Sequence, residues 1–244
     1  MPDITAGRSA QFKVDNAANW DTARDASTAT ASKPTNGAFV KLATASGGYD
    51  IYRGAMAFNT SGISEAPASV TLKLYGFGSQ KVNNIRIVKG NQAATGDYNS
   101  DYVDGDFDQL VFGTPYSDEF NVSSWTTSGF NEITLNAAAR SDMASLSSFE
   151  IFIVAEHDFD DSDPNTATKS GPGWRGVAYA NSSRRPKISY TAASVSSETH
   201  RQKLKRLRRK RTRGSKGKGF ATTKIESPTS GGKVVGNGFK TNGF

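Results

Sequence analysis

The sequence predicts an all-β domain over residues 1–195, an antiparallel β-sandwich of jelly-roll type, followed by a basic, Gly-rich tail over residues 196–244. Three observations lead to this fold class. Apolar residues recur with a period of two in short runs, and turn sequences rich in Gly, Asn and Ser separate these runs. The spacing of strand, helix and strand that builds a parallel sheet does not occur. We therefore expect about eight or nine short antiparallel strands.

The alternating runs follow one another through the first 195 residues, and each places apolar side chains on one face, as half-buried antiparallel strands do. The run 149–154 is apolar on both faces, which predicts a strand buried on both sides. Residues 136–146 are the one place where we expect a short helix. The alternating apolar positions are Phe12 and Val14; Val70, Leu72 and Leu74; Ile85 and Ile87; Ile133 and Leu135; Ile188 and Tyr190.

Charge divides the chain at the same boundary. Residues 1–195 carry 16 Lys/Arg and 21 Asp/Glu, a net charge of −5, whereas residues 196–244 carry 14 Lys/Arg and 2 Asp/Glu, a net charge of +12. The overall charge of +7 therefore hides an acidic domain and a basic arm. We expect contact with polyanions from the arm and not from the domain.

Several protein classes are disfavoured by what the sequence does not contain. Without cysteine there is no disulfide framework and no thiolate metal site. The first residues, MPDITAGRSAQF, have no apolar core of the kind found in signal peptides. The longest apolar run, 151–155, is too short to cross a bilayer, so we expect no membrane insertion.

No catalytic motif stands out. The two histidines are His157, beside two acidic residues, and His200, in the basic tail. Nucleophile-elbow, phosphate-loop and zinc-protease motifs do not occur. A glycosidase needs only two carboxylates, and the sequence offers no pair to prefer. We expect a protein that is not an enzyme.

Two acidic segments are candidates for a structural calcium ion, because calcium takes six to eight oxygen ligands and clustered loop carboxylates supply several of them. One segment lies between residues 97 and 108. The other is the stronger candidate and carries four aspartates, Asp158, Asp160, Asp161 and Asp163. The alternative is a solvated acidic loop without a cation.

Aromatic residues in or near predicted loops could bind a glycan, because sugars stack on flat exposed rings. Trp174 lies in a Gly- and Pro-rich segment, which predicts that a turn presents it to solvent. The alternative for each tryptophan is packing in the core. The glycan-binding candidates are Trp125, Trp174, Tyr98 and Tyr102.

The basic tail is the strongest local signal. Its lysines and arginines predict phosphate contacts that weaken with salt, and no aromatic residue lies among them, so we expect no sequence-specific readout. We expect its partner to be non-specific nucleic acid, an acidic protein surface or, least favoured, anionic lipid; the alternative is a solubilising or processing-related tail. Recurring Gly-Phe pairs suggest docking through Phe220, Phe239 and Phe244, the alternative being chance repetition in a Gly-rich segment. The polyanion-binding candidates are Arg201, Lys203, Lys205, Arg206, Arg208, Arg209, Lys210, Arg211 and Arg213.

Four segments carry a family resemblance: YRGAMAFNTSGI at 52–63, ASVTLKLY at 68–75, NEITLN at 131–136, and the pair GVAYAN at 176–181 and RPKISY at 185–190. Together they resemble the DNRLRE-like β-sandwich modules, which are related to carbohydrate-binding modules. The resemblance implies a jelly-roll-like sandwich without enzymatic activity, as found in extracellular polysaccharide-binding proteins and in phage structural proteins. The basic tail departs from the family pattern.

Two functions follow as expectations. The first is a virion structural protein, of phage type, made in the host cytoplasm, which forms homo-oligomers or binds other virion proteins and is anchored by its basic arm. The second is a carbohydrate-binding module that recognises polysaccharide through exposed Trp and Tyr side chains. The arm favours the first.

Overall fold

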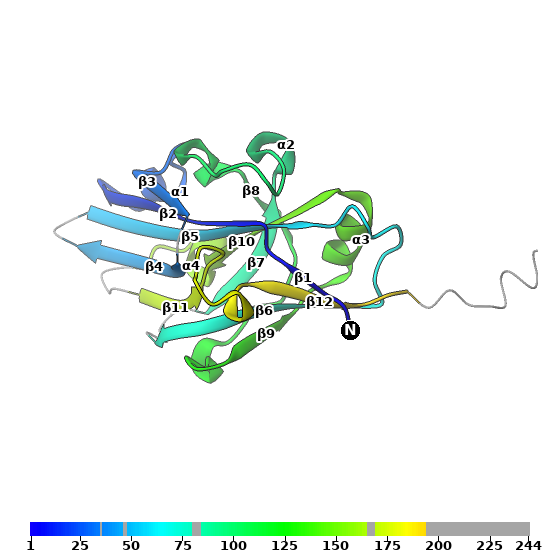
Figure 1. The fold of residues 1–244 in the computed structure, drawn as a ribbon. Helices are drawn as coiled ribbons and strands as arrows, with labels where there is room; N and C mark the ends of the chain where they lie inside the picture. The colour runs from blue at the N-terminus through cyan, green and yellow to red at the C-terminus, as the bar shows by residue number, and fades with distance from the viewer. Residues whose placement is uncertain (35, 46–47, 80–83, 165–168, 194–244) are drawn as a thin grey trace, which may run out of the picture. The chain divides into compact units, whose positions relative to one another are not determined.

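The alternating apolar pattern produces an antiparallel β protein in the computed structural model, which describes residues 1–34, 36–45, 48–79, 84–164 and 169–193 (Figure 1). The chain divides into two units, Met1–Ser194 and Val195–Phe244, and all described residues belong to the first. The strands of the described part are β1 Asp3–Thr5, β2 Arg8–Ala17, β3 Ala31–Pro34, β4 Gly37–Ala45, β5 Gly48–Asn59, β6 Ser69–Ser79, β7 Ile85–Gly90, β8 Leu110–Pro115, β9 Phe130–Thr134, β10 Ser148–Ala155, β11 Lys169–Arg175 and β12 Lys187–Thr191.

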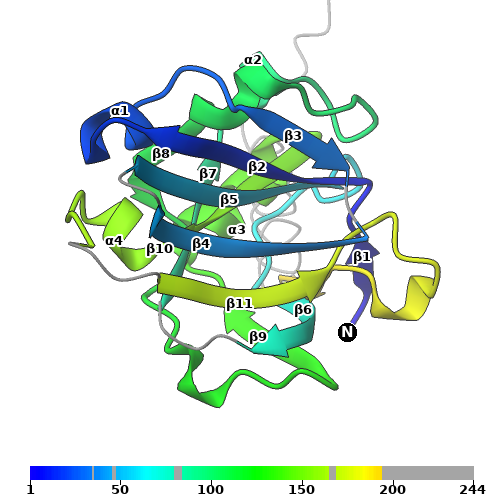
Figure 2. The same cartoon turned by 90° about the vertical axis from the view of Figure 1, so that its left-hand side faces the viewer.

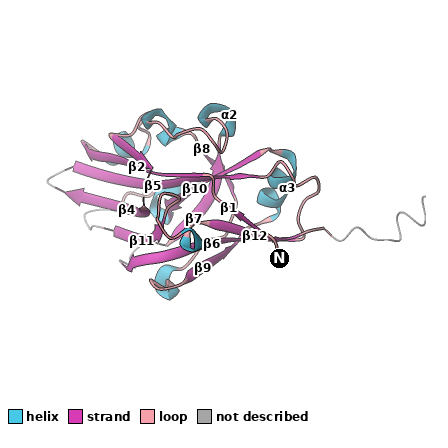
Figure 3. Cartoon of the chain, viewed as in Figure 1, coloured by secondary structure: helices cyan, strands magenta, loops and turns pink. Residues whose placement is uncertain are grey.

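Helices in the described residues are short and lie at the ends and edges of the strands (Figure 3). The longest, α3, follows the predicted helical segment and begins after Asn136, whose side chain accepts hydrogen bonds from the backbone N–H groups of Ala138 and Ala139. The helices are α1 Trp20–Arg24, α2 Gln92–Thr95, α3 Ala137–Ser145 and α4 Glu156–Phe159, with 3-10 turns η1 Asp104–Asp108, η2 Val122–Ser124 and η3 Ser182–Arg184.

All strand pairs are antiparallel, and two long strands change partners along their length. The hydrogen-bonded order is β1-β12-β6-β11-β4-β5-β10-β7-β8, with β2 on the other side of β5, β3 beside β2 and β9 beside β6. The first half of β5 pairs with β4 and its second half with β10. In β6, Ser69–Lys73 pairs with β12, whereas Gly76, Phe77 and Ser79 pair with β11. Figure 2 shows β2, β5, β4 and β11 side by side across one face.

The core forms where the apolar faces of these strands meet. Phe12 of β2 stacks on Phe152 of β10, with ring centroids 5.8 Å apart, and the edge of Tyr102 meets Phe12 at 5.6 Å. Every residue of β10 is buried, which confirms the prediction of a strand covered on both sides. Aromatic burial and ring contacts of this kind provide much of the apolar stabilisation of a β domain.

The Gly- and Pro-rich segment around Trp174 does not form the predicted turn. It forms β11, although its sequence KSGPGWR has the composition of a turn. β11 tolerates its proline because the register with β4 and with β6 shifts at this point, so that Pro172 sits at an irregularity of the ladder. Gly171 and Gly173 of this strand let the backbones of β4 and β6 approach closely, at Val40 and Phe77.

Candidate functional site

A buried ion pair organises the end of the domain where α4 follows β10. Arg53 of β5 and Asp158 of α4 are almost completely buried, with side-chain exposures of 0% and 2%. Two parallel bonds join them, from Nε to Oδ2 and from Nη2 to Oδ1, each 2.8 Å long. This two-point geometry is the strong form of an arginine–carboxylate contact, and burial makes its loss costly.

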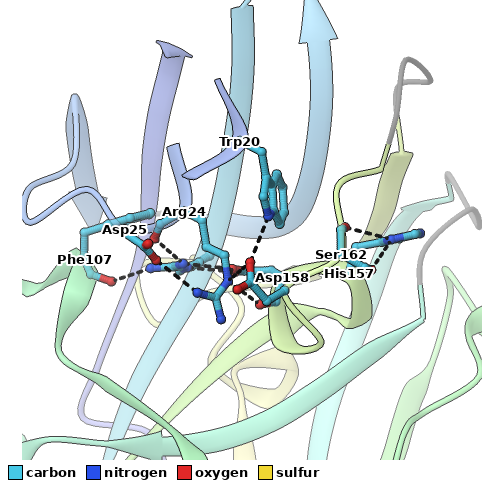
Figure 4. A network of polar contacts seen from close by, with 9 residues as sticks. Trp20, Arg24, Asp25, Phe107, His157, Asp158 and Ser162 are labelled. Atoms are coloured by element: carbon cyan, nitrogen blue, oxygen red, sulfur yellow. Dashed lines mark hydrogen bonds and ion pairs between the residues drawn. The ribbon is translucent and has the colours of Figure 1, made fainter. Parts of the chain in front are cut away.

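The remaining donors of this pair are also satisfied. Arg53 donates to the backbone oxygens of Phe107 and Arg24, at 3.2 and 2.8 Å, and its guanidinium lies 4.1 Å from the centre of the Phe107 ring. Arg24 donates from Nε to the backbone oxygen of Asp158 at 3.1 Å and forms an ion pair with Asp161 (Figure 4). The network therefore joins β5, α1, η1 and α4 into one rigid corner.

The calcium expectation is corrected by this network. Asp158 is bound to Arg53, Asp161 accepts a hydrogen bond from the indole Nε1 of Trp20 at 3.0 Å, and Asp163 accepts one from Tyr49 at 2.9 Å. Asp160 is exposed at the end of α4. Within the described residues, no three His, Cys, Asp or Glu side chains come together in a way that could hold a metal ion.

His157 lies next to Asp158 in α4 and contacts Ser162. Its Nδ1 lies 2.9 Å from the hydroxyl and 3.2 Å from the backbone oxygen of Ser162, in the turn that follows α4 (Figure 4). These contacts hold the two ends of this short turn together.

Trp125 and Trp174 do not form an exposed glycan platform, which corrects a second expectation. Their exposed fractions are 2% and 0%. Trp174 belongs to β11 and packs against Gly54, while Trp125 lies against Gly76 and meets the edge of Phe120 at 6.1 Å. A glycine under each indole provides the space for a large ring inside the sheet, and this pairing between distant residues cannot be read from the local sequence.

A second buried pair lies beside the loop that carries Tyr98 and Tyr102. Arg8 Nη2 is 3.2 Å from Glu150 Oε1, and the Arg8 guanidinium lies 3.9 Å from the centre of the Tyr102 ring. Arg8 also donates to backbone oxygens of Thr95, Gly96 and Ser100. Burial raises the pKa of Glu150, although the hydroxyl of Thr95 and the charge of Arg8 act in the opposite direction.

Arg8 of this pair and the neighbouring Tyr102 line a small pocket of about 80 Å³. The pocket offers a carboxylate from Asp101, which is exposed, beside the buried Arg8 and Tyr102. Tyr98 closes the adjoining loop over Gly7, since a methyl group at Gly7 would lie 2.7 Å from the Tyr98 backbone oxygen. Two of the four glycan candidates thus lie close together. The lining residues are Gly7, Arg8, Ser9, Ala10, Asp101, Tyr102 and Val177.

Sequence reasoning missed both buried arginines. The sequence carries a signal for Arg53, because it is the one charged residue in the largely apolar run IYRGAMAF at 51–58, and the structure buries every residue of this run. A charged residue within a buried strand needs a charged partner. The partner, Asp158, is 105 residues away, and only the fold identifies it.

The tail candidates lie outside the described residues. They are the lysines and arginines Arg201, Lys203, Lys205, Arg206, Arg208, Arg209, Lys210, Arg211 and Arg213, and the phenylalanines Phe220, Phe239 and Phe244.

No protein-family model and no curated protein matches the chain. Among the described residues, no helix has the length and hydropathy needed to cross a membrane.

Proposed function

We propose that the chain is a non-enzymatic structural protein of a virion, of phage type, in which the β domain is a surface, appendage or capsid-associated building block. In this proposal the basic arm anchors the domain to neighbouring subunits or to packaged nucleic acid. The finer fold, a jelly-roll-like sandwich, belongs to the same proposal. It is supported by the way β5 and β6 change partners along their length, as strands do at the corners of two-sheet architectures.

The observation that carries the proposal is the change of charge where the described domain ends. The domain has a net charge of −5, β12 ends at Thr191, and the Lys/Arg run starts at Arg201, inside a segment of net charge +12. A segment so rich in like charges and so poor in apolar residues gains order from a polyanion or an acidic surface. Its attachment to a rigid β domain suits a subunit that is held in a particle.

The test has two stages. Particles purified from the culture that produces the chain should contain it, as measured by mass spectrometry of gradient fractions. A full-length variant with the nine tail residues between Arg201 and Arg213 changed to Gln should then be lost from the particles. A chain missing from all particle fractions contradicts the structural role, and normal incorporation of the Gln variant contradicts anchoring by the arm.

A second candidate function, glycan binding, is favoured by the small pocket beside Tyr102. The exposed Asp101 can accept hydrogen bonds from sugar hydroxyl groups, and the Tyr102, Ala10 and Val177 side chains give the lining an apolar part, so the pocket suits a neutral sugar better than an anion. In a glycan array, Asp101→Asn should lose the signal, while Asp108→Asn, an exposed aspartate in the neighbouring turn, should keep it. Equal binding by both variants contradicts a sugar site in this pocket.

A further inference from the structure

Cations and aromatic rings alternate on the outer face of strands β6, β9, β11 and β12. Along β6, Leu72 and Leu74 are fully buried, whereas Lys73, Tyr75 and Phe77 are half-buried and share the opposite face. Tyr75 of β6 lies directly across from Phe130 of β9. We call this surface the arginine–aromatic strip and define it as Tyr75, Phe77, Phe130, Arg175, Tyr179 and Arg184.

The rings of the strip hold its two arginines in place. The Arg175 guanidinium lies 4.5 Å from the centre of the Phe77 ring and 4.3 Å from that of Tyr179. The Arg184 guanidinium lies 4.7 Å from the centre of the Tyr75 ring. The rings of Tyr75 and Phe130 meet edge to face at 5.4 Å.

Glycines make room for the strip. A methyl group at Gly37 would lie 2.6 Å from Cζ of Phe77, and Gly173 is the direct partner of Phe77 across the β6–β11 ladder. The Phe77 ring therefore lies close to the backbone. Guanidinium groups held against rings in this way lose less freedom when they bind an anion.

The two arginines are not neutralised. In the described part of the chain neither Arg175 nor Arg184 forms an ion pair with an acidic side chain, whereas the nearby Lys73 and Lys187 pair with Glu132 and Asp3 at 2.9 and 3.0 Å. Residues 169–193 contain five Lys/Arg and no Asp/Glu. The strip is thus a positive surface on a domain whose net charge is negative.

The geometry points to one kind of ligand: we propose that the strip binds single-stranded nucleic acid. Arg175 lies against rings at two positions, and because its Nε is buried, its terminal Nη groups are the donors that suit a phosphate. Arg184 has one ring contact and keeps the other side of its guanidinium plane for a base, and bases stack on such planes. A neutral sugar would need bare ring faces, and the arginines cover those of Tyr75 and Phe77.

This inference concerns the β domain and does not depend on the virion role or on the arm. The test uses the full chain and a fluorescent oligo(dT) in which 5-iodouridine replaces some thymines. After irradiation, mass spectrometry should find crosslinks in the peptides that contain Tyr75 or Tyr179, in addition to any in the tail. Crosslinks found only in residues 194–244 overturn the proposal.

Affinity gives an independent measure. Arg175→Gln with Arg184→Gln should weaken oligo(dT) binding about tenfold or more and reduce the slope of log affinity against log salt by about 1.4, because each phosphate contact on a single strand contributes about 0.7. The matched control, Lys13→Gln with Arg140→Gln, removes the same charge away from the strip and should leave both values unchanged. Equal loss in both variants overturns the proposal, as does displacement of the oligonucleotide by polyglucuronate at an equal charge concentration. Near-UV circular dichroism verifies that both variants are folded.

Discussion

Trp174 of β11 and Gly54 of β5 fit together so closely that a methyl group at Gly54 would lie 2.7 Å from Cη2 of the indole and closer still to Cζ2. The cross-strand partners of Trp174, Ala38 and Gly76, are also small. A large ring is therefore surrounded by residues that leave space for it. This relationship explains why a tryptophan in a Gly- and Pro-rich segment is fully buried.

The first prediction concerns this fit. Gly54→Ala should lower the free energy of unfolding by about 1–3 kcal/mol, because the added methyl group forces the indole or a strand to move within a packed core. Urea denaturation followed by tryptophan fluorescence measures the change. Gly62→Ala is the matched control, since a methyl group there meets no atom within 4 Å. Equal stability of the two variants would contradict the packing described.

The second prediction concerns the buried ion pair. Asp158→Asn should cost about 3–5 kcal/mol, because the Arg53 charge is left inside the domain without a counter-charge. Thermal and urea denaturation measure the loss. Asp25→Asn, which breaks the exposed pair with Arg24, should cost less than about 1 kcal/mol.

A double variant separates charge from shape in the same pair. Arg53→Met with Asp158→Leu removes both charges and should be more stable than Asp158→Asn alone. A double variant that is less stable than the single one would show that the hydrogen bonds to Phe107 and Arg24, and not the ion pair, determine stability at this corner.

The third prediction concerns pH. The folded domain raises the pKa of Glu150, so above the usual glutamate pKa of about 4.3 it retains a proton that the unfolded chain has released. The contribution of Glu150 to the free energy of unfolding therefore falls as the pH rises through the raised pKa. The difference in unfolding free energy between wild type and Glu150→Gln should decline from pH 4 to pH 7. A constant or rising difference would show that Arg8, and not burial, controls this carboxyl group.

The fourth prediction concerns the start of α3. Asn136 caps the helix through its Oδ1 and donates from Nδ2 to the backbone oxygen of Pro115 at 2.7 Å. Asn136→Ala should cost about 1–2 kcal/mol through loss of the cap. Asn136→Ser keeps a capping oxygen and loses only the bond to Pro115, so it should be the more stable of the two. The opposite order in chemical denaturation contradicts the capping role.

The sequence predicted the elements whose residues follow a simple period. The strands around Val70–Leu74 and Phe149–Val154, and the helix after Asn136, lie where local alternation and a capping residue place them. β11 could not be predicted, because its glycines and proline are read as a turn and become a strand only through pairing with β4 and β6.

The surroundings of the candidate site residues could not be predicted, because they depend on contacts between residues that are distant in the sequence. The local sequence groups Asp158 with three other aspartates, but its partner Arg53 lies 105 positions away and neutralises it. The local sequence predicts exposed loops at Trp125 and Trp174, whereas the space at Gly76 and Gly54 allows both indoles to be buried. The change of net charge at residue 195 could be predicted without the fold, because it follows from composition alone.

The central claim is that the basic arm anchors this acidic β domain. The most direct test is the salt dependence of oligo(dT) binding. It is measured for the full chain and for the variant in which the nine Lys and Arg residues between Arg201 and Arg213 are changed to Gln. The slope of log affinity against log salt concentration should be several units steeper for the wild type than for the variant. At 50 mM salt the variant should have lost most of the wild-type affinity. Identical slopes and affinities for the two proteins would contradict the account of the arm as an anchor to nucleic acid.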